Sequence, residues 1–191
     1  MSKTRLEAFS DGVIAIIITI MVLELKIPEG NTLASLAPVA PKFLSYLLSF
    51  VFVGIYWNNH HHLMHIVERI NGKVLWANMH LLFWLSIVPF ATGWMGENEL
   101  SATPVAAYGF VLLMAGFAYY LLTLALLAIH TPGSTLAKAI SINTKEYISL
   151  VSYLAAVPLA FVNPWIAVGS YVFVAVIWFI PDPRVEKVLG E

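Results

Sequence analysis

Apolar residues come in long runs along this chain, and short stretches rich in proline, glycine and charge separate the runs. A helix needs about 20 predominantly apolar residues to cross the hydrocarbon core of a bilayer. Runs near that length lie at residues 6–25, 43–65, 74–95, 104–129, 147–162 and 165–180. The pattern predicts an all-α integral membrane protein with six transmembrane helices.

The segments between the runs contain residues that end or begin helices. Pro28 and Gly30 follow the first apolar run, and Pro181 follows the sixth run. Pro104 suits the first turn of the fourth helix, where a missing N–H costs nothing. A weakly polar loop is expected before the second helix and a short interfacial helix at 135–143. No internal repeat divides the chain, so residues 1–191 are expected to form a single six-helix domain.

The basic residues indicate how these helices are oriented in the membrane. Six spans place both termini on one side, and only Lys26 and Lys42, out of ten Lys and Arg residues, fall on the other. An excess of Lys and Arg marks cytoplasmic loops. We therefore expect a multi-pass protein of the cell membrane with cytoplasmic termini. The eight residues expected on that side are Lys3, Arg5, Arg69, Lys73, Lys138, Lys145, Arg184 and Lys187.

Composition excludes several classes of function. Only 11% of the residues are charged, against about 25% in soluble domains. The formal net charge of −1 leaves no basic surface for nucleic acid. The chain has no cysteine, and it contains no Gly-rich phosphate loop, no nucleophile elbow and no pair of intramembrane carboxylates. We expect neither an enzyme nor a cofactor-binding protein.

The first apolar run places two different surfaces on one helix. At about 100° per residue, Asp11 lies about 140° from Ile16 and Glu24 about 80° from it. Helix packing explains such an apolar stripe, since a threonine in a helix often bonds a carbonyl of the preceding turn. Pore lining is the alternative, and the pattern by itself does not decide between the two. The stripe consists of Gly12, Ile16, Thr19, Ile20, Leu23 and Ile27.

Polar residues from three helices are expected at similar depth in the inner half of the membrane. A charge near the bilayer centre costs on the order of 2.5–3.5 kcal/mol, so such groups usually find partners. We expect Asp11 to be structural and to pair across helices with inner-half groups such as His80, Asn58 or His61. The whole expected network comprises Arg5, Ser10, Asp11, Asn58, His61 and His80.

The histidines of the second run offer a metal site as an alternative to that network. Trp57, His61 and His65 share one helical face, and the two histidines have a spacing that can chelate a metal. Membrane oxygenases and desaturases use several separated histidine boxes with acids, whereas this chain has one cluster and the isolated His80. A hydrogen-bonded structural role is therefore favoured, and no metal is expected.

Two motifs carry a family resemblance. The first helix contains Arg5 and then Phe9-Ser10-Asp11, and the second contains Gly54-Ile55-Tyr56-Trp57 before paired histidines. This pattern resembles the transmembrane-protein-175 family of potassium channels. The resemblance covers the whole chain as one six-helix repeat, the prokaryotic type, and implies a pore lined by the first helices around a symmetry axis.

The resemblance also assigns roles to the residues of the stripe. It implies a hydrophobic constriction five residues after the motif's Asp, at Ile16, and a further apolar ring at Leu23. The hydroxyl layer associated with selectivity falls at Thr19, while Gly12, Ile20 and Ile27 line the rest. Apolar rings can close a pore by dewetting, and hydroxyls can replace part of an ion's hydration shell. Glu24 is expected at the outer vestibule.

The expected function is therefore passive potassium conduction with weak selectivity among cations. The expected partners are membrane lipid, the permeant K⁺ and three further copies of the chain in a homotetramer. A proton-coupled secondary transporter using Asp11 and the inner histidines is the alternative. Transporters tend to show internal repeats and broken midplane helices, which the sequence lacks. A non-conducting structural protein is a third possibility.

Overall fold

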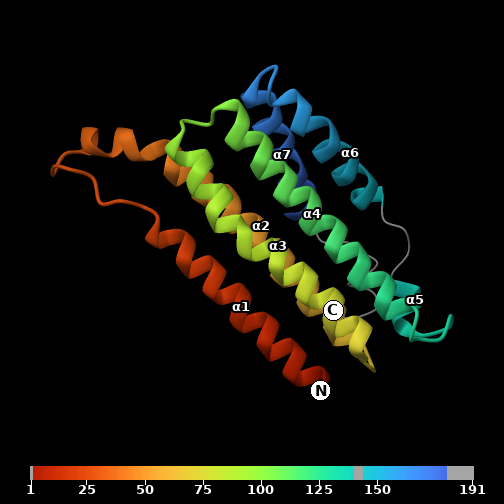
Figure 1. The fold of residues 1–191 in the computed structure, drawn as a ribbon. Helices are drawn as coiled ribbons and strands as arrows, with labels where there is room; N and C mark the ends of the chain where they lie inside the picture. The colour runs from red at the N-terminus through yellow and green to blue at the C-terminus, as the bar shows by residue number, and fades with distance from the viewer. Residues whose placement is uncertain (1, 140–143, 180–191) are drawn as a thin grey trace.

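The computed structural model describes residues 2–139 and 144–179, and in these residues it contains helices and no strand. The all-helical class expected from the sequence is confirmed (Figure 1). The helices are α1 (Lys3–Leu23), the 3₁₀ helix η1 (Leu33–Val39), α2 (Ala40–Ile66), α3 (Gly72–Glu97), α4 (Ala102–Leu127), α5 (Thr135–Ala139), α6 (Thr144–Leu159) and α7 (Pro164–Phe179).

Each expected apolar run coincides with a long helix, but the lengths differ. Within the described residues, four helical segments are long and apolar enough to cross a membrane, namely α1, η1 with α2, α3 and α4. α6 and α7 have 16 residues each. A helix of that length is about 24 Å long, which is less than the hydrocarbon core of about 30 Å.

The helix ends show why the boundaries fall where they do. The Ser2 hydroxyl accepts a hydrogen bond from the Arg5 N–H, so α1 begins before the apolar run. The Asn71 side chain caps α3 in the same way. Part of the expected loop before α2 forms η1 instead. α5 covers part of the short helix expected at 135–143, and the rest of it lies outside the described residues, as do Pro181, Arg184 and Lys187.

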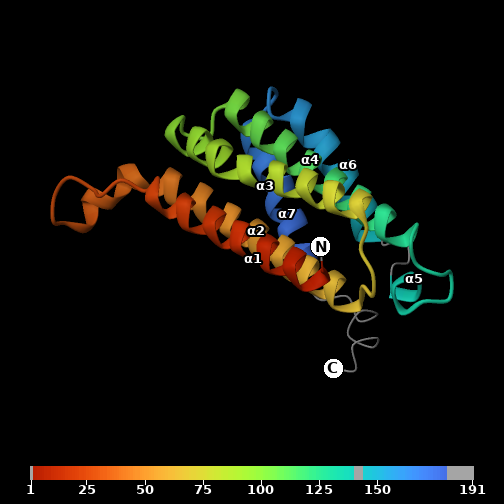
Figure 2. The same cartoon turned by 60° about the horizontal axis from the view of Figure 1, so that its bottom comes forward.

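The long helices lie side by side, with α1 at one edge of the bundle. α1 packs against α2 and α3, and α3 packs against α4. α6 and α7 pack on each other and on α4, and α7 also reaches α2. Figure 2 shows α1 beside α2, with η1 extending past the ends of the other helices. One face of α1 is therefore left without a neighbour in the protomer.

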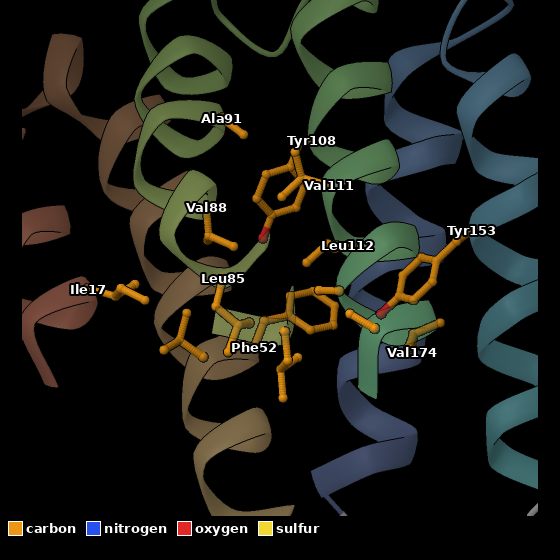
Figure 3. Packing of buried hydrophobic residues seen from close by; sticks show 14 of the residues in the cluster. Ile17, Phe52, Leu85, Val88, Ala91, Tyr108, Val111, Leu112, Tyr153 and Val174 are labelled. Atoms are coloured by element: carbon orange, nitrogen blue, oxygen red, sulfur yellow. The ribbon is translucent and has the colours of Figure 1, made fainter. Parts of the chain in front are cut away.

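The core runs continuously across these helices. Figure 3 shows Ile17 of α1 directed toward α3, with Tyr108 of α4 and Tyr153 of α6 further across the bundle. α7 approaches α4 so closely at Gly109 that a Cβ there would collide with the Tyr171 hydroxyl. That hydroxyl donates a hydrogen bond to the Val105 carbonyl at 3.1 Å. Glycine at position 109 therefore permits the packing of α7 on α4.

Polar contacts tie together the elements at each end of the bundle. Lys3 Nζ donates to the His65 carbonyl at 3.1 Å, and the Glu68 N–H donates to His130 Nε2 at 3.2 Å. The N-terminus, the α2–α3 connection and the end of α4 therefore meet at one end (Figure 1). At the opposite end Lys42 pairs with Glu97 at 3.1 Å.

Candidate functional site

Helix α1 has one face in the core and the opposite face uncovered. Its buried residues are Leu6, Ser10, Ile14, Ile17 and Met21. The uncovered face is the α1 stripe, which we define as Gly12, Ile16, Thr19, Ile20 and Leu23; all five are exposed.

The sequence predicted that Ile27 belongs to this stripe, but the structure places Ile27 outside it. α1 ends at Leu23, where Glu24 caps the helix. The 100° spacing therefore does not extend to Ile27, and its expected position on the helix is wrong. Ile27 lies in the connection to η1 with 92% of its surface exposed.

The exposure of the α1 stripe is large for aliphatic side chains. Ile16 is 58% exposed, Ile20 43% and Leu23 80%. Apolar surface of this extent needs a partner, which in a membrane is lipid or another protein surface. The protomer supplies no such partner from its described residues.

Thr19 is the one side-chain hydroxyl on this face, and its proton is directed back to its own helix. Oγ1 lies 2.9 Å from the Ile16 carbonyl and 3.2 Å from the Ala15 carbonyl. A threonine hydroxyl has one proton and two lone pairs. Since the proton serves these carbonyls, the lone pairs are available to a cation or water on the exposed side. Back-bonding, the packing explanation for Thr19, is thus present and is compatible with pore lining.

Asp11 has a different partner from those expected. The Trp57 indole N–H donates to Asp11 Oδ1 at 3.1 Å. His61 Nδ1 lies 3.8 Å from Glu7 Oε1, and His80 Nε2 accepts from the Trp84 indole at 2.9 Å. Asp11 therefore pairs across helices as expected, but its partner is Trp57 and not one of the three residues given as examples. The indole N–H sits at the end of a long side chain and reaches Asp11 from the same face of α2 as His61.

A buried chain of hydrogen bonds fixes α1 against α2 and α3. Asn78 Oδ1 can only accept, so His60 Nε2 donates to it at 2.8 Å. Asn78 Nδ2 donates to Ser10 Oγ at 2.9 Å, and Ser10 Oγ donates to the Leu6 carbonyl at 2.9 Å. His60, Asn78 and Ser10 are fully buried. Because these polar groups have no access to water, they are satisfied only when α1 is rotated so that Ser10 faces Asn78. In this rotation the α1 stripe faces outward.

Of the network expected from the sequence, only Ser10 belongs to this buried chain. Arg5 and Asn58 are exposed, and their side chains make no hydrogen bond or ion pair with the described residues. The expectation missed His60 and Asn78. Asn78 is a polar residue inside the third apolar run, which is a signal that it shares with His80. His60 could not be separated from its neighbouring histidines without knowing which face of α2 is buried.

The histidine face of α2 has the expected geometry. The rings of Trp57 and His61 stack with centroids 6.0 Å apart, and the His61 and His65 centroids are 6.4 Å apart. Among residues 2–139 and 144–179, no group of three or more side chains is placed to hold a metal ion. The contacts that this face makes are the ring contacts among Trp57, His61 and His65 and the contact of His61 with Glu7.

Glu24 lies at the opposite end of α1 and is turned toward α3. Its Oε2 would lie 3.8 Å from a Cβ placed on Gly93. Lys26 and Lys42 both pair with Glu97, at 3.6 and 3.1 Å. The exposed Glu24 carboxylate therefore lies next to the α1 stripe without an ion pair to Lys26 or Lys42.

These features define a class of protein: an all-helical membrane protein with an uncovered, mostly apolar helix face that includes one hydroxyl. The family described as "Endosomal/lysosomal potassium channel TMEM175" matches residues 5–89. A potassium channel of Chryseobacterium sp. (strain P1-3) is 54% identical over 191 residues, which is 100% of both chains. A potassium channel of Chamaesiphon minutus is 33% identical over 187 residues, 92% of each chain. The chain belongs to the TMEM175 family, which is a family of ion channels and not of enzymes.

Structural comparison supports this assignment. The crystal structure of a lysosomal potassium-selective channel TMEM175 homolog from Chamaesiphon minutus matches with a TM-score of 0.80 and 28% identity. The match covers 93% of this chain and 96% of that one. The bovine relative, named endosomal/lysosomal proton channel TMEM175, is 29% identical over 178 residues, 84% of this chain and 36% of that protein. The resemblance inferred from the sequence motifs is confirmed.

Proposed function

We propose that this protein is a homotetrameric potassium channel of the cell membrane with α1 lining the pore. The observation that carries the proposal is the exposed α1 stripe with Thr19 at its centre. One protomer supplies a single copy of this surface, and a closed ring of copies would enclose it. The bacterial and cyanobacterial relatives named potassium channels support K⁺ as the permeant ion.

In this proposal six helices cross the bilayer and the termini are cytoplasmic. The contacts from Lys3 to His65 and from Glu68 to His130 support a shared end for Lys3, Arg5, Arg69 and Lys73. Positive charge on one side favours the cytoplasm for that end. α6 and α7 would cross with less apolar length than the others, which a locally thinner bilayer accommodates at modest cost.

Each residue of the α1 stripe then has a role in conduction. Rings of Ile16 and Leu23 exclude water and close the pore by dewetting. The Thr19 lone pairs face the ion and set the selectivity of the pore, while Gly12 and Ile20 line the rest of the pore wall. Ile27 lines the outer entrance beyond the helix end, and Glu24 raises the local cation concentration in the outer vestibule.

Proton permeation is a second candidate, because the animal relatives are named proton channels. Proton-coupled transport through Asp11 and the inner histidines is the other alternative. Asp11 lies off the α1 stripe and its carboxylate is bonded to Trp57. This placement favours a structural role for Asp11 over a role as a carrier site.

Reversal potentials in liposomes separate these functions. A K⁺ channel under a tenfold KCl gradient at equal pH reverses near the K⁺ equilibrium potential, about 59 mV for one charge. A proton channel responds only when a pH gradient replaces the KCl gradient. For a proton-coupled transporter the reversal potential depends on both the K⁺ and the pH gradient, in the fixed ratio of its coupling stoichiometry. A structural protein gives the same current as protein-free liposomes. The K⁺ result supports the proposal and any of the others overturns it.

A further inference from the structure

A cavity of about 390 Å³ lies among α2, α4, α6 and α7, and no residue of α1 lines it. Small-molecule sites commonly have volumes of roughly 300–1,000 Å³ and are lined mainly by apolar and aromatic side chains. This cavity belongs to the far side of the bundle from the α1 stripe. Its occupant is therefore a separate question from ion conduction.

Aromatic rings dominate the lining of this cavity. Tyr56, Phe117, Tyr120, Tyr147 and Trp178 come from all four helices. The Trp178 indole N–H donates to Ser149 Oγ at 2.8 Å, so its polar atom is already bonded within the protein. Trp178 therefore offers the cavity the face or edge of its ring rather than a free donor.

Glu146 is the one carboxylate among the lining residues that the structure describes. Its carboxylate forms no hydrogen bond or ion pair with the residues that the structure describes. Among residues 2–139 and 144–179 no Lys or Arg lines the cavity, so these residues offer no counter-charge to an anionic head group. A single carboxylate also falls far short of the six to eight oxygen ligands of a hard metal ion such as Ca²⁺.

Aromatic faces with a carboxylate are the chemistry that recognises organic ammonium ions. Ring quadrupoles attract such cations, and Trp and Tyr are the strongest partners. We propose that this cavity binds an amphiphilic organic cation, a tertiary or quaternary ammonium with an alkyl tail. The ammonium lies against Glu146 and the neighbouring rings, and the tail follows the apolar wall formed by Phe52, Leu113 and Leu150.

Photolabelling of the full-length protein in lipid nanodiscs tests this assignment. The probe is an alkyltrimethylammonium with a diazirine in its tail, and the matched probe carries a neutral hydroxyl head on the same tail. Labelled peptides are mapped and quantified against probe concentration. The ammonium probe is expected to label the cavity-lining segments saturably and at lower concentration than the hydroxyl probe.

Two variants distinguish the cavity from the surrounding lipid. A Cβ at Gly116 would meet only the Tyr56 hydroxyl, at 3.6 Å, so Gly116→Leu fills the cavity without displacing backbone. Gly169→Leu is the control, because a Cβ there meets nothing within 4 Å and position 169 does not line the cavity. Gly116→Leu should abolish saturable labelling, and Gly169→Leu should leave it unchanged. If Gly116→Leu does not assemble, Tyr120→Leu, which removes a half-exposed ring, should still weaken labelling.

Glu146→Gln tests the charge and keeps the shape. It should weaken labelling by the ammonium probe roughly fivefold to tenfold and leave the hydroxyl probe unchanged. Glu99→Gln, an exposed carboxylate outside the cavity, is its control. Equal labelling by both probes with no effect of Glu146→Gln would show a cavity for apolar tails only. Labelling insensitive to both Gly116→Leu and Tyr120→Leu would place the site elsewhere; either result overturns the proposal.

Discussion

The Trp57 indole of α2 donates a hydrogen bond to the Asp11 carboxylate of α1 at 3.1 Å. This contact lies at the opposite flank of α1 from Ile16, by about 140° of helix rotation. Together with the buried chain through Asn78, it holds α1 on the bundle from two sides. The supports of α1 are thus separate from the residues proposed to conduct.

Trp57→Phe is expected to lower the stability of the assembled protein modestly. Phenylalanine retains an aromatic ring next to His61 and removes the pyrrole part of the indole with its N–H donor to Asp11. A hydrogen bond to a charged group contributes about 1.5–3 kcal/mol when buried. Because Trp57 is 45% exposed, we expect a loss of about 1 kcal/mol or less, seen as a melting temperature lower by a few degrees. Trp76→Phe, at a 78% exposed indole, is the control; an equal shift in both variants would contradict the role of the Asp11 contact.

Asn78→Leu is expected to cost more than Trp57→Phe. The substitution retains volume but leaves the fully buried His60 Nε2–H unpaired and removes the donor to Ser10 Oγ, which keeps its bond to the Leu6 carbonyl. Each buried polar group left unpaired costs about 1–3 kcal/mol. Thermal unfolding in one detergent should show the loss, together with a smaller oligomer yield. Asn58→Leu is the matched control, since Asn58 is exposed and should tolerate the change; an Asn78→Leu variant as stable as wild type would remove the buried chain from the account.

The contrast between Asn78 and Asn58 shows what the sequence could predict here. Apolar run length predicted where the long helices lie, and four helical segments of the described residues have the length and apolarity of a membrane span. Run length does not say which way a nearly uniform apolar helix is rotated. The sequence therefore placed Asn58 in the polar network and missed Asn78 and His60. Helical spacing did predict the α1 stripe, since α1 lies at an edge and its periodicity is not overridden by neighbours on that side.

The predictions that failed depend on contacts between helices or on helix ends. Trp57 as the partner of Asp11 requires the relative rotation of α1 and α2. Ile27 does not lie on the stripe because α1 ends at Leu23, whereas the helical spacing was continued as far as Ile27. The aromatic cavity draws Tyr56 and Glu146 from helices far apart in the chain. No local pattern in the sequence contains that juxtaposition.

Thr19→Val is expected to reduce selectivity without closing the pore. Valine retains the shape of threonine and removes the hydroxyl whose lone pairs face outward. K⁺ should lose more permeability than the larger, more weakly hydrated Cs⁺. Bi-ionic reversal potentials measure this directly, and Thr19→Ser, which keeps the hydroxyl, should stay close to wild type. Identical reversal potentials in the valine variant and wild type would remove Thr19 from the selectivity layer.

Glu24→Gln is expected to lower single-channel current mainly at low ionic strength. The Glu24 carboxylate has no ion pair to Lys26 or Lys42, which both pair with Glu97. Its attraction for cations is screened over about 10 Å at 0.1 M salt and about 3 Å at 1 M. Single-channel currents are compared in about 0.01 M and about 1 M KCl, where the screening length is about 30 Å and about 3 Å. A loss of equal proportion at both concentrations would contradict a vestibule role.

The central claim is that Ile16 closes a pore made of α1 helices. Ile16→Asn should wet the constriction and raise basal K⁺ flux, while Ile16→Leu should stay nearly closed because its ring remains apolar. If the α1 stripe only packs against lipid or protein, asparagine should reduce the yield of folded protein without any leak. The decisive experiment measures two quantities on the same preparation of Ile16→Asn: the K⁺ flux from liposomes and the yield of tetramer. Normal assembly with raised flux is the predicted result, and normal assembly with wild-type flux would contradict the assignment of α1 as the pore helix.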